Sequence, residues 1–427
     1  MKINIPESAN KRVVIVGAGF AGLSAVKKLK NKPVQVVLID KNNYHTFQPL
    51  LYQVATGGLE SNSIAYPIRR IIKKGKNLYY RMAEVTRILP QSNLIETSIG
   101  ELTYDYLIIA TGSKPNFYNL EDKKDNLLVL KTIPQALDMR SFIIQNFESA
   151  LLAESTEAEE EFLNLVIVGG GPTGVELAGA LAEMKKFILP AEYPEIDFSK
   201  MHIYLIEASE RLLSAMSMRA SEKALVYLKK LGIKIYLKSH VNNFDDKYVY
   251  FNENEKILSE TIIWTAGVKG NIINGLPDEA EKANRFLVNQ FNQVSSFNNI
   301  FAIGDLALMT SDEYPKGHPM LATVAIQQGK TTAKNILKLI SKLPMDSFRY
   351  FDKGSMATVG KNKAVADLRV LKLSGFLAWF IWMFIHIVSI AGFRNRIVIF
   401  TDWIWNYFTY ERALRLIIRP VKKNITV

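Results

Sequence analysis

One pattern occurs twice along this chain and limits the folds that are open to it. In each copy a short apolar run leads into a glycine-rich turn, a helical run, a second apolar run and an acidic residue. The first copy has its turn at 17–22 and ends at Asp40; the second has its turn at 169–174 and ends at Glu207. This order of strand, turn, helix, strand and acid is the fingerprint of a βαβ dinucleotide-binding unit. The chain is therefore predicted to contain two such units.

The three glycines of each turn have separate physical roles. The first permits the tight turn, the second lets the backbone approach a pyrophosphate, and the third lets the helix pack closely on the strand. The helix that follows presents free N–H groups and the positive end of its dipole to the phosphates. These glycines are Gly17, Gly19 and Gly22 in the first copy and Gly169, Gly171 and Gly174 in the second.

The acid that closes each copy suits the hydroxyls of a ribose. Asp40 and Glu207 would each accept hydrogen bonds from the ribose diol. Because a carboxylate repels a 2′-phosphate, Glu207 favours NADH over NADPH. The stretch before the acid is longer in the second copy, and we interpret 185–201, which contains two prolines, as an insertion between helix and strand.

Three further apolar runs end in small residues, at 106–112, 262–267 and 300–305. Small residues at the carboxyl ends of parallel strands allow a ligand to approach closely. Each run taken alone also fits an ordinary buried strand that ends in a turn. The acid in the last run, Asp305, is the more informative feature, since its carboxylate could bind a ribityl hydroxyl.

The absence of cysteine excludes several kinds of chemistry. The chain has 427 residues and no Cys, so disulfides, thiolate nucleophiles, iron–sulfur clusters and Cys-ligated zinc are excluded. Its five histidines are scattered and predict no metal site. Any redox chemistry must therefore use a bound organic cofactor. Residues 1–10 contain no apolar run, so no signal peptide is expected and the body of the protein is predicted to be cytoplasmic.

The C-terminal region combines apolar, aromatic and basic residues. The stretch 373–393 contains no charged residue, but it has tryptophans in its middle, and Trp prefers the interface to the bilayer centre. The run 403–419 mixes apolar and basic residues at near-helical spacing. The formal net charge of +12 is compatible with nucleic acid, an anionic membrane or anionic cofactors as partners. The tail 394–427 is both basic and rich in Trp, Tyr, Phe and Ile, which favours a membrane surface. We favour a helix in the interface plane; a true span and a helical dimer interface are the alternatives, and no nucleic-acid partner is expected.

Together these features resemble the type II NADH dehydrogenases, the single-subunit NADH:quinone oxidoreductases. The resemblance covers essentially the whole chain. Beyond the two fingerprints it rests on the segments 44–57, 170–179 and 375–396, and the match in the last segment is not expected of a generic nucleotide-binding fold.

The resemblance implies non-covalent FAD in the first unit, NADH as the substrate in the second, and a membrane quinone as the electron acceptor. It also implies that Glu176 is a catalytic carboxylate near flavin and nicotinamide, although Glu176 also fits a helix-start residue that complements the dipole. Thr323 stands where the family pattern has a glutamine, and this departure bears on how the quinone is held. The implied FAD-binding residues are Gly17, Gly19, Gly22, Asp40, Thr111, Gly112, Gly304 and Asp305. The implied NADH-binding residues are Gly169, Gly171, Gly174 and Glu207, and the implied quinone residues are Thr323, Ala325 and Gln327.

The sequence thus predicts an α/β fold with two Rossmann-like dinucleotide-binding domains and a C-terminal amphipathic helical module that anchors the protein to a membrane. The predicted boundaries are 1–118 and 284–343 for the FAD domain, 119–283 for the NADH domain and 344–427 for the membrane module. The expected protein is a peripheral, monotopic NADH:quinone oxidoreductase on the cytoplasmic face of the cell membrane, without proton pumping, and a homodimer is left open. The alternatives are a soluble reductase that serves a small protein carrier and a non-catalytic flavoprotein that senses NADH.

Overall fold

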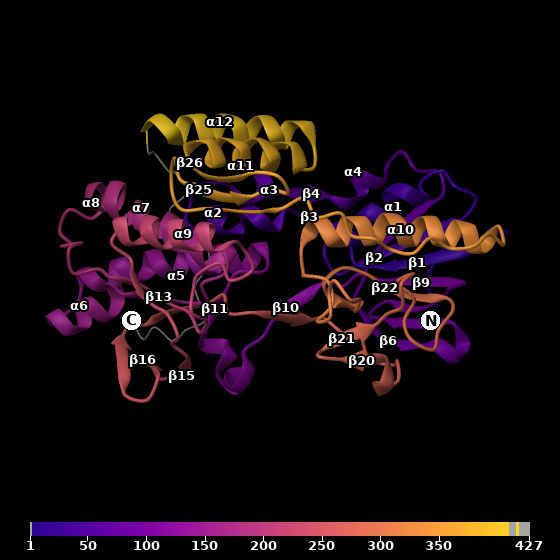
Figure 1. The fold of residues 1–427 in the computed structure, drawn as a ribbon, viewed down its shortest axis with the longest axis horizontal. Helices are drawn as coiled ribbons and strands as arrows, with labels where there is room; N and C mark the ends of the chain where they lie inside the picture. Colours follow the sequence, from indigo (N-terminus) through magenta and orange to yellow (C-terminus); the bar gives the residue numbers. More distant parts are fainter. Residues whose placement is uncertain (1, 410–415, 418–427) are drawn as a thin grey trace. The chain divides into compact units, whose positions relative to one another are not determined.

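A computed structural model of the chain describes residues 2–409 and 416–417 (Figure 1). The chain forms two compact units, each built from several segments. Unit 1 consists of residues 1–45, 66–114 and 268–352, and unit 2 of residues 46–65, 115–267 and 353–427. These units are defined by contacts within the chain and not by the ligands they bind, so the domain boundaries predicted from the sequence remain a prediction.

Unit 1 is built on a parallel sheet of five strands in the order β22-β9-β1-β2-β5. Alternate residues of β1 point to opposite faces: Val14 and Val16 join one apolar cluster, and Val13 and Ile15 join another. Helices α1 and α10 pack side by side in this unit (Figure 1). The elements are β1 (Arg12–Val16), β2 (Gln35–Asp40), β5 (Leu78–Met82), β9 (Tyr106–Ile109), β22 (Ile300–Ala302), α1 (Phe20–Leu29), α4 (Ile68–Ile72) and α10 (Ala322–Ile340).

Unit 2 repeats this plan with a second parallel sheet, in the order β11-β18-β12-β13-β14. Strands β12 and β18 are buried along their whole length, as expected where helices cover both faces of a parallel sheet. The elements are β11 (Leu128–Val129), β12 (Leu165–Val168), β13 (Ile203–Ile206), β14 (Lys234–Tyr236), β18 (Thr261–Trp264), α5 (Ile133–Leu151), α6 (Thr156–Leu163), α7 (Pro172–Phe187) and α9 (Met218–Lys230). The α/β prediction with two Rossmann-like sheets is confirmed.

Smaller sheets and short helices complete the two units. The predicted insertion at 185–201 contains the short helix α8 (Leu189–Glu192). Unit 1 also has β6 (Val85–Leu89), β7 (Leu94–Thr97), β8 (Gly100–Thr103), β20 (Glu281–Lys282), β21 (Arg285–Leu287) and β23 (Ala307–Leu308). Unit 2 also has α2 (Leu51–Ala55), α3 (Ser61–Ile64), β15 (Val241–Phe244), β16 (Tyr248–Phe251) and β17 (Glu255–Leu258). Four short strands lie where the chain passes from one unit to the other, namely β3 (Tyr44–Thr46), β4 (Ala65–Pro67), β10 (Ser113–Pro115) and β19 (Val268–Gly270).

The C-terminal part of unit 2 is a three-stranded antiparallel sheet followed by two helices, α11 (Phe376–Ser389) and α12 (Phe393–Thr409). The sheet contains β24 (Ser355–Thr358), β25 (Ala364–Asp367) and β26 (Lys372–Gly375). The uncharged stretch 373–393 is thus divided between β26, α11, a bend at 390–392 and the first residue of α12. Within the described residues, no helix has both the length and the apolar character needed to cross a bilayer. The helix predicted at 403–419 is seen as far as Thr409, and most of its remainder lies outside the described residues.

Candidate active site

The first glycine turn joins β1 to α1 in unit 1, and each of its three glycines has a different environment. Gly17 has a φ of +103°, and a Cβ there would overlap the carbonyl oxygen of Ala110. A Cβ on Gly22 would overlap the carbonyl oxygen of Gly17. A Cβ on Gly19, in contrast, would meet no atom within 4 Å. The first and third glycines are therefore required by the backbone itself, whereas the second faces open space at the start of α1.

Asp40 ties the end of β2 to this turn. Its carboxylate accepts hydrogen bonds from the backbone N–H of Ala18 at 2.6 Å and of Asn42 at 2.7 Å. Burial raises the pKa of Asp40, and these two hydrogen bonds oppose that shift. Gly19 is the N-cap residue of helix α1, and no side-chain hydrogen bond caps this helix start. Because no side chain covers its first N–H groups, this helix start is suited to an anion such as a phosphate.

The ends of β9 and β22 lie beside the same turn, because these strands are parallel neighbours of β1 in the sheet. Asp305 accepts a hydrogen bond of 2.5 Å from the Ser113 hydroxyl. The Thr111 hydroxyl donates to the Asn271 carbonyl at 2.7 Å. Gly112, with a φ of +71°, has nothing within 4 Å of a Cβ position. The predicted FAD-binding residues at these strand ends thus lie together at one edge of the sheet of unit 1.

The second glycine turn, between β12 and α7 in unit 2, repeats the first in detail. Gly169 has a φ of +110° and lies against Ala266, and a Cβ on Gly174 would overlap the carbonyl oxygen of Gly169. Gly171 again faces open space, at the uncapped start of α7.

Glu207, at the end of β13, has the position in unit 2 that Asp40 has in unit 1. Its carboxylate accepts hydrogen bonds from the N–H of Gly170 at 2.5 Å, the N–H of Ser209 at 2.7 Å and the hydroxyl of Ser209 at 2.5 Å. The predicted NADH-binding residues of unit 2 therefore surround one turn.

The three predicted quinone residues lie in the first two turns of α10 in unit 1. The Thr323 hydroxyl is 2.9 Å from the Tyr350 hydroxyl, which donates to Asp352 at 3.3 Å. Gln327 donates its amide N–H to the Phe351 carbonyl and accepts from the Phe351 N–H, both at 2.9 Å. A Cβ on Gly304 would lie 3.4 Å from the Ala325 methyl, so Ala325 is close to the strand-end site. The sequence did not indicate that the Gln327 amide is already paired with backbone.

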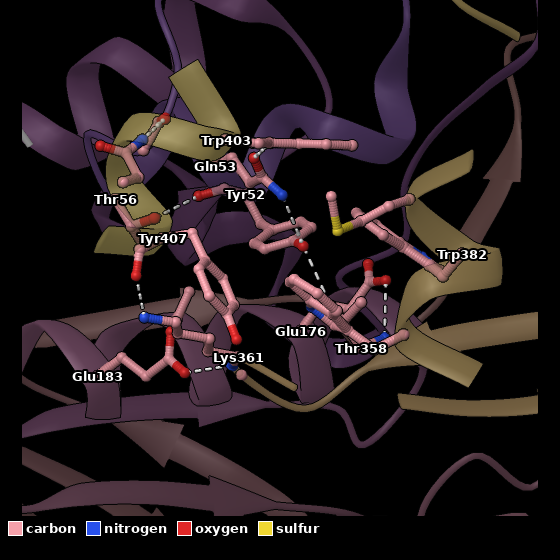
Figure 2. A pocket seen from close by; sticks show the side chains of 16 residues that line it. Tyr52, Gln53, Thr56, Glu176, Glu183, Thr358, Lys361, Trp382, Trp403 and Tyr407 are labelled. Atoms are coloured by element: carbon pink, nitrogen blue, oxygen red, sulfur yellow. Dashed lines mark hydrogen bonds between the residues drawn. The ribbon is translucent and has the colours of Figure 1, made fainter. Parts of the chain in front are cut away.

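Glu176 lies on α7 and is buried in unit 2. One carboxylate oxygen accepts a hydrogen bond from the Thr358 N–H at 3.3 Å. Burial raises the pKa of Glu176 to about 8, while Thr358 and the indole of Trp382 both act to lower it. The Trp382 Nε1 does not reach hydrogen-bond geometry with any partner in the described part of the chain. Figure 2 shows these side chains together at the wall of one pocket.

That pocket is a cavity of about 110 Å³ within unit 2. Burial, followed by the charge of Glu176, raises the pKa of Tyr52, whose hydroxyl is 3.0 Å from the Thr358 hydroxyl. The wall opposite α7 comes from α11 and α12 (Figure 2). The aromatic side chains of that wall are Trp379, Trp382, Trp403 and Tyr407. The sequence indicates a membrane interface for the tail aromatics, but their spacing gives no sign of a cavity shared with Glu176.

Neither a metal-ligand cluster nor a thiol is found among the described residues. No cluster of His, Asp and Glu in this part of the chain could hold a metal ion. The chain also has no cysteine.

Comparisons with known proteins cover nearly the whole chain. The family model "Pyridine nucleotide-disulphide oxidoreductase" matches residues 11–329, and the model "NDH2 C-terminal domain" matches residues 353–410. The chain is 33% identical to the type II NADH:quinone oxidoreductase Ndh of Mycobacterium tuberculosis, over 94% of this chain and 89% of that protein. It is 28% identical to the Staphylococcus aureus type II NADH:quinone oxidoreductase, over 83% of this chain and 89% of that protein.

Solved structures show the same fold. The structure of NDH2 from Plasmodium falciparum in complex with NADH matches with a TM-score of 0.88 at 23% identity, and covers 96% of this chain and 100% of that chain. The sulfide:quinone oxidoreductase of Aquifex aeolicus matches with a TM-score of 0.72 at 20% identity, and covers 94% of this chain and 96% of that chain.

Proposed function

The chain belongs to the type II NADH:quinone oxidoreductases, within the pyridine nucleotide-disulphide oxidoreductases, and from this premise we propose which of its residues carry the reaction. Its activity is the oxidation of NADH with transfer of electrons to a quinone. The family implies FAD as the cofactor. When bound, FAD would supply the redox chemistry, which is hydride acceptance from NADH and two-electron transfer to the quinone, while the residues of this chain would hold it.

We assign FAD binding to unit 1. The uncapped start of α1 at Gly19 offers N–H groups and open space to the pyrophosphate. Asp40 keeps lone pairs for a ribose diol beyond its two backbone hydrogen bonds. We assign the ribityl hydroxyls to Asp305, which Ser113 holds by a hydrogen bond, and Gly112, with no atom within 4 Å of a Cβ position, leaves room at the same strand end. The residues present therefore fit the cofactor that the family implies.

We assign NADH binding to unit 2. There Gly171 leaves open space at the start of α7, and Glu207 accepts a hydrogen bond from the Gly170 N–H of the same turn. The Glu207 carboxylate is fixed by Gly170 and Ser209, so it is preorganised to accept a hydrogen bond from a ribose. A fixed negative charge at this position disfavours the 2′-phosphate of NADPH.

We propose that Glu176 holds and releases a proton for the reduction of the quinone. A carboxyl with a pKa of about 8 carries a proton at neutral pH and can release it within the physiological range. The adjoining cavity, at about 110 Å³, has room for several waters that could exchange that proton. Reduction of a quinone to a quinol consumes two protons, and a buried group of this kind could deliver one.

Thr323, Ala325 and Gln327 are proposed to face the quinone from α10. Because Tyr350 donates to Asp352, the Thr323 hydroxyl is left to donate to Tyr350 and then presents lone pairs. Those lone pairs suit the hydroxyl of a quinol product. The methyl of Ala325 allows a flat ring to approach, while the paired amide of Gln327 fixes the helix against residues 350–352.

Membrane attachment is proposed for the outer face of α11 and α12. Large apolar side chains on this face are exposed, with Phe384 at 63% and Phe408 at 77% exposure. The others are Phe376, Leu377, Phe380, Ile385, Val388, Phe393, Ile397, Phe400, Ile404 and Trp405. An exposed apolar face of this extent is typical of an interaction site. A bilayer surface would bury it if both helices lay in the plane of the membrane interface. We propose peripheral attachment at the cytoplasmic face of the cell membrane.

The main support for the proposed reaction is the pair of glycine turns, each with an acid held by hydrogen bonds. A spectroscopic titration tests the reaction. The purified protein should show flavin absorbance, which NADH should bleach and a short-chain quinone should restore. A protein that binds no flavin on reconstitution, or whose reduced flavin fails to transfer electrons to any quinone, would exclude the proposed reaction.

A charged residue on the outer face of α11 should weaken membrane binding. Phe384→Asp is expected to reduce binding to lipid vesicles at least tenfold, because burial of one Phe is worth about 2 kcal/mol and a buried charge adds a penalty. Flavin reduction by NADH should not change. The matched control is Leu152→Asp, at a position that is 82% exposed at the end of α5. Unchanged vesicle binding together with loss of a dimer would show that the face is a subunit interface instead.

A further inference from the structure

Two neighbouring segments of unit 1 carry nine basic residues and no acidic one. The first segment, residues 27–32, ends α1, and the second, residues 69–76, contains most of α4 and the loop before β5. The nine residues are Lys27, Lys28, Lys30, Lys32, Arg69, Arg70, Lys73, Lys74 and Lys76. All are exposed except Lys30, which is half-buried. We call them the basic surface.

Hydrogen bonds hold the two segments together. The Asn77 side chain donates to the carbonyls of Leu29 and Lys32, at 3.0 and 3.1 Å, and accepts from the N–H of Asn31 at 2.7 Å. The N–H of Lys76 in turn donates to the Asn31 side chain at 3.2 Å. Figure 1 shows α1 and α4 within the same part of unit 1. These hydrogen bonds therefore hold the two basic segments next to each other.

Among the described residues, the guanidinium of Arg69 lies over the ring of Tyr80, but no carboxylate pairs with these charges. No ion pair involves any of the nine residues among residues 2–409. Ile68 and Ile72 of α4 are buried in the core of unit 1, so the basic residues between and after them face outward. Lysines and arginines gathered without acids repel one another, and an anionic partner would remove that repulsion.

A short stretch of chain joins this surface to the segment on which α12 is held. Asn395 of α12 donates to the carbonyls of Asn62, Ser63 and Ala65, at 3.0 to 3.1 Å. Only residues 66–68 separate that anchored segment from Arg69. The basic surface is thus continuous in the chain with the segment to which α12 is fastened.

We propose that the basic surface binds the anionic headgroups of membrane phospholipids and forms a second lipid contact besides the apolar face of α11 and α12. This inference rests on the membrane attachment proposed above. Phospholipid is favoured over nucleic acid because neither 27–32 nor 69–76 contains an aromatic residue on which bases could stack. Each basic residue close to an anionic bilayer strengthens binding by about fivefold, so several together have a large effect.

Sedimentation with lipid vesicles tests the proposal on the full-length flavoprotein. The variant Lys73→Gln, Lys74→Gln, Lys76→Gln removes three charges from the basic surface. The control variant Arg87→Gln, Lys282→Gln, Lys316→Gln removes three exposed charges elsewhere in unit 1. Vesicles of phosphatidylcholine alone are compared with vesicles that also contain phosphatidylglycerol, at low and at high salt. Flavin content and NADH oxidation with a soluble acceptor show that each variant is folded and active.

We expect the first variant to bind anionic vesicles at least tenfold more weakly at low salt, with a smaller salt dependence, and the control to bind within twofold of the unaltered protein. Binding to phosphatidylcholine alone should be the same for all three. Equal binding of both variants to anionic vesicles would overturn the proposal, as would an affinity for oligonucleotides that only the first variant loses. These readouts measure lipid binding and not turnover, so a failure of quinone reduction would be recognised separately.

Discussion

Glu207→Arg should lower kcat/KM for NADH by about 100-fold to 1000-fold while flavin remains bound. Gly170 and Ser209 already donate three hydrogen bonds to this carboxylate, which leaves one acceptor site for a ribose hydroxyl. That hydrogen bond to a charged acceptor is worth about 1.5–3 kcal/mol, and the variant also loses the support that Glu207 gives to Gly170 and Ser209. The new positive charge would also suit the 2′-phosphate of NADPH, so the preference between the two nucleotides should shift toward NADPH. Steady-state kinetics with both nucleotides measure this ratio.

The control for this experiment is Glu207→Gln, which keeps the size of the side chain and one carbonyl acceptor but removes the charge. Its kcat/KM for NADH should lie between the values of the unaltered protein and of Glu207→Arg. Flavin absorbance should be the same in all three proteins, because Glu207 belongs to unit 2 and the predicted FAD residues to unit 1. Unchanged NADH kinetics in Glu207→Arg would refute the assignment of the second glycine turn to NADH.

Glu176→Gln should slow steady-state quinone reduction by about 100-fold, and flavin reduction by NADH should change by less than twofold. Proton delivery by a positioned group contributes about that much to a rate, and glutamine keeps an acceptor for the Thr358 N–H but has no proton to exchange. In the unaltered protein the rate should fall as pH rises through about 8, where the pKa of the buried carboxyl lies. This fall should be absent from the variant. Glu183→Gln, two turns along α7 and at the same cavity, is the control.

The same carboxyl makes stability depend on pH. The folded protein keeps this proton up to about pH 8, whereas the unfolded chain releases it near the ordinary pKa of 4.5. The free energy of unfolding should therefore decrease between those values as pH rises, and Glu176→Gln should remove that part of the decrease. Denaturant unfolding at pH 5 and pH 8 measures it. A variant with the parental pH dependence of both stability and quinone reduction would show that Glu176 does not hold the proton.

The glycine turns could be predicted from the sequence because their demands are local. The positive φ of Gly17 and the carbonyl oxygen of Gly17 that faces Gly22 are requirements set within the turn, and Gly169 and Gly174 repeat them. The contact of Gly17 with Ala110 adds a tertiary requirement that the spacing does not record. The glycine that faces open space, Gly19, is also the one whose predicted role is to admit a ligand. Short-range sterics leave a fixed spacing in the sequence, and such spacing can be recognised without a structure.

The surroundings of Glu176 could not be predicted in this way. Its hydrogen-bond donor is Thr358, 182 residues further along the chain, and the cavity also takes walls from residues near 52 and from α11 and α12. The amide of Gln327 gave no sign that it would be paired with Phe351. Such contacts follow from how distant segments pack, and no periodicity or spacing in the sequence records them.

One side of helix α12 is exposed and apolar, and the other side contributes to the cavity around Glu176. Its outer side chains are apolar and exposed, while Trp403 donates to Gln53 at 2.8 Å and Asn406 to the Gly58 carbonyl at 3.1 Å at the rim of the cavity. Detergent that loosens this helix would admit bulk solvent to the carboxyl of Glu176 and bring its pKa back toward 4.5. Enzyme assayed in micelles would then show a more acidic pH optimum than enzyme embedded in native lipid, and the bilayer itself would act as part of the acid–base machinery.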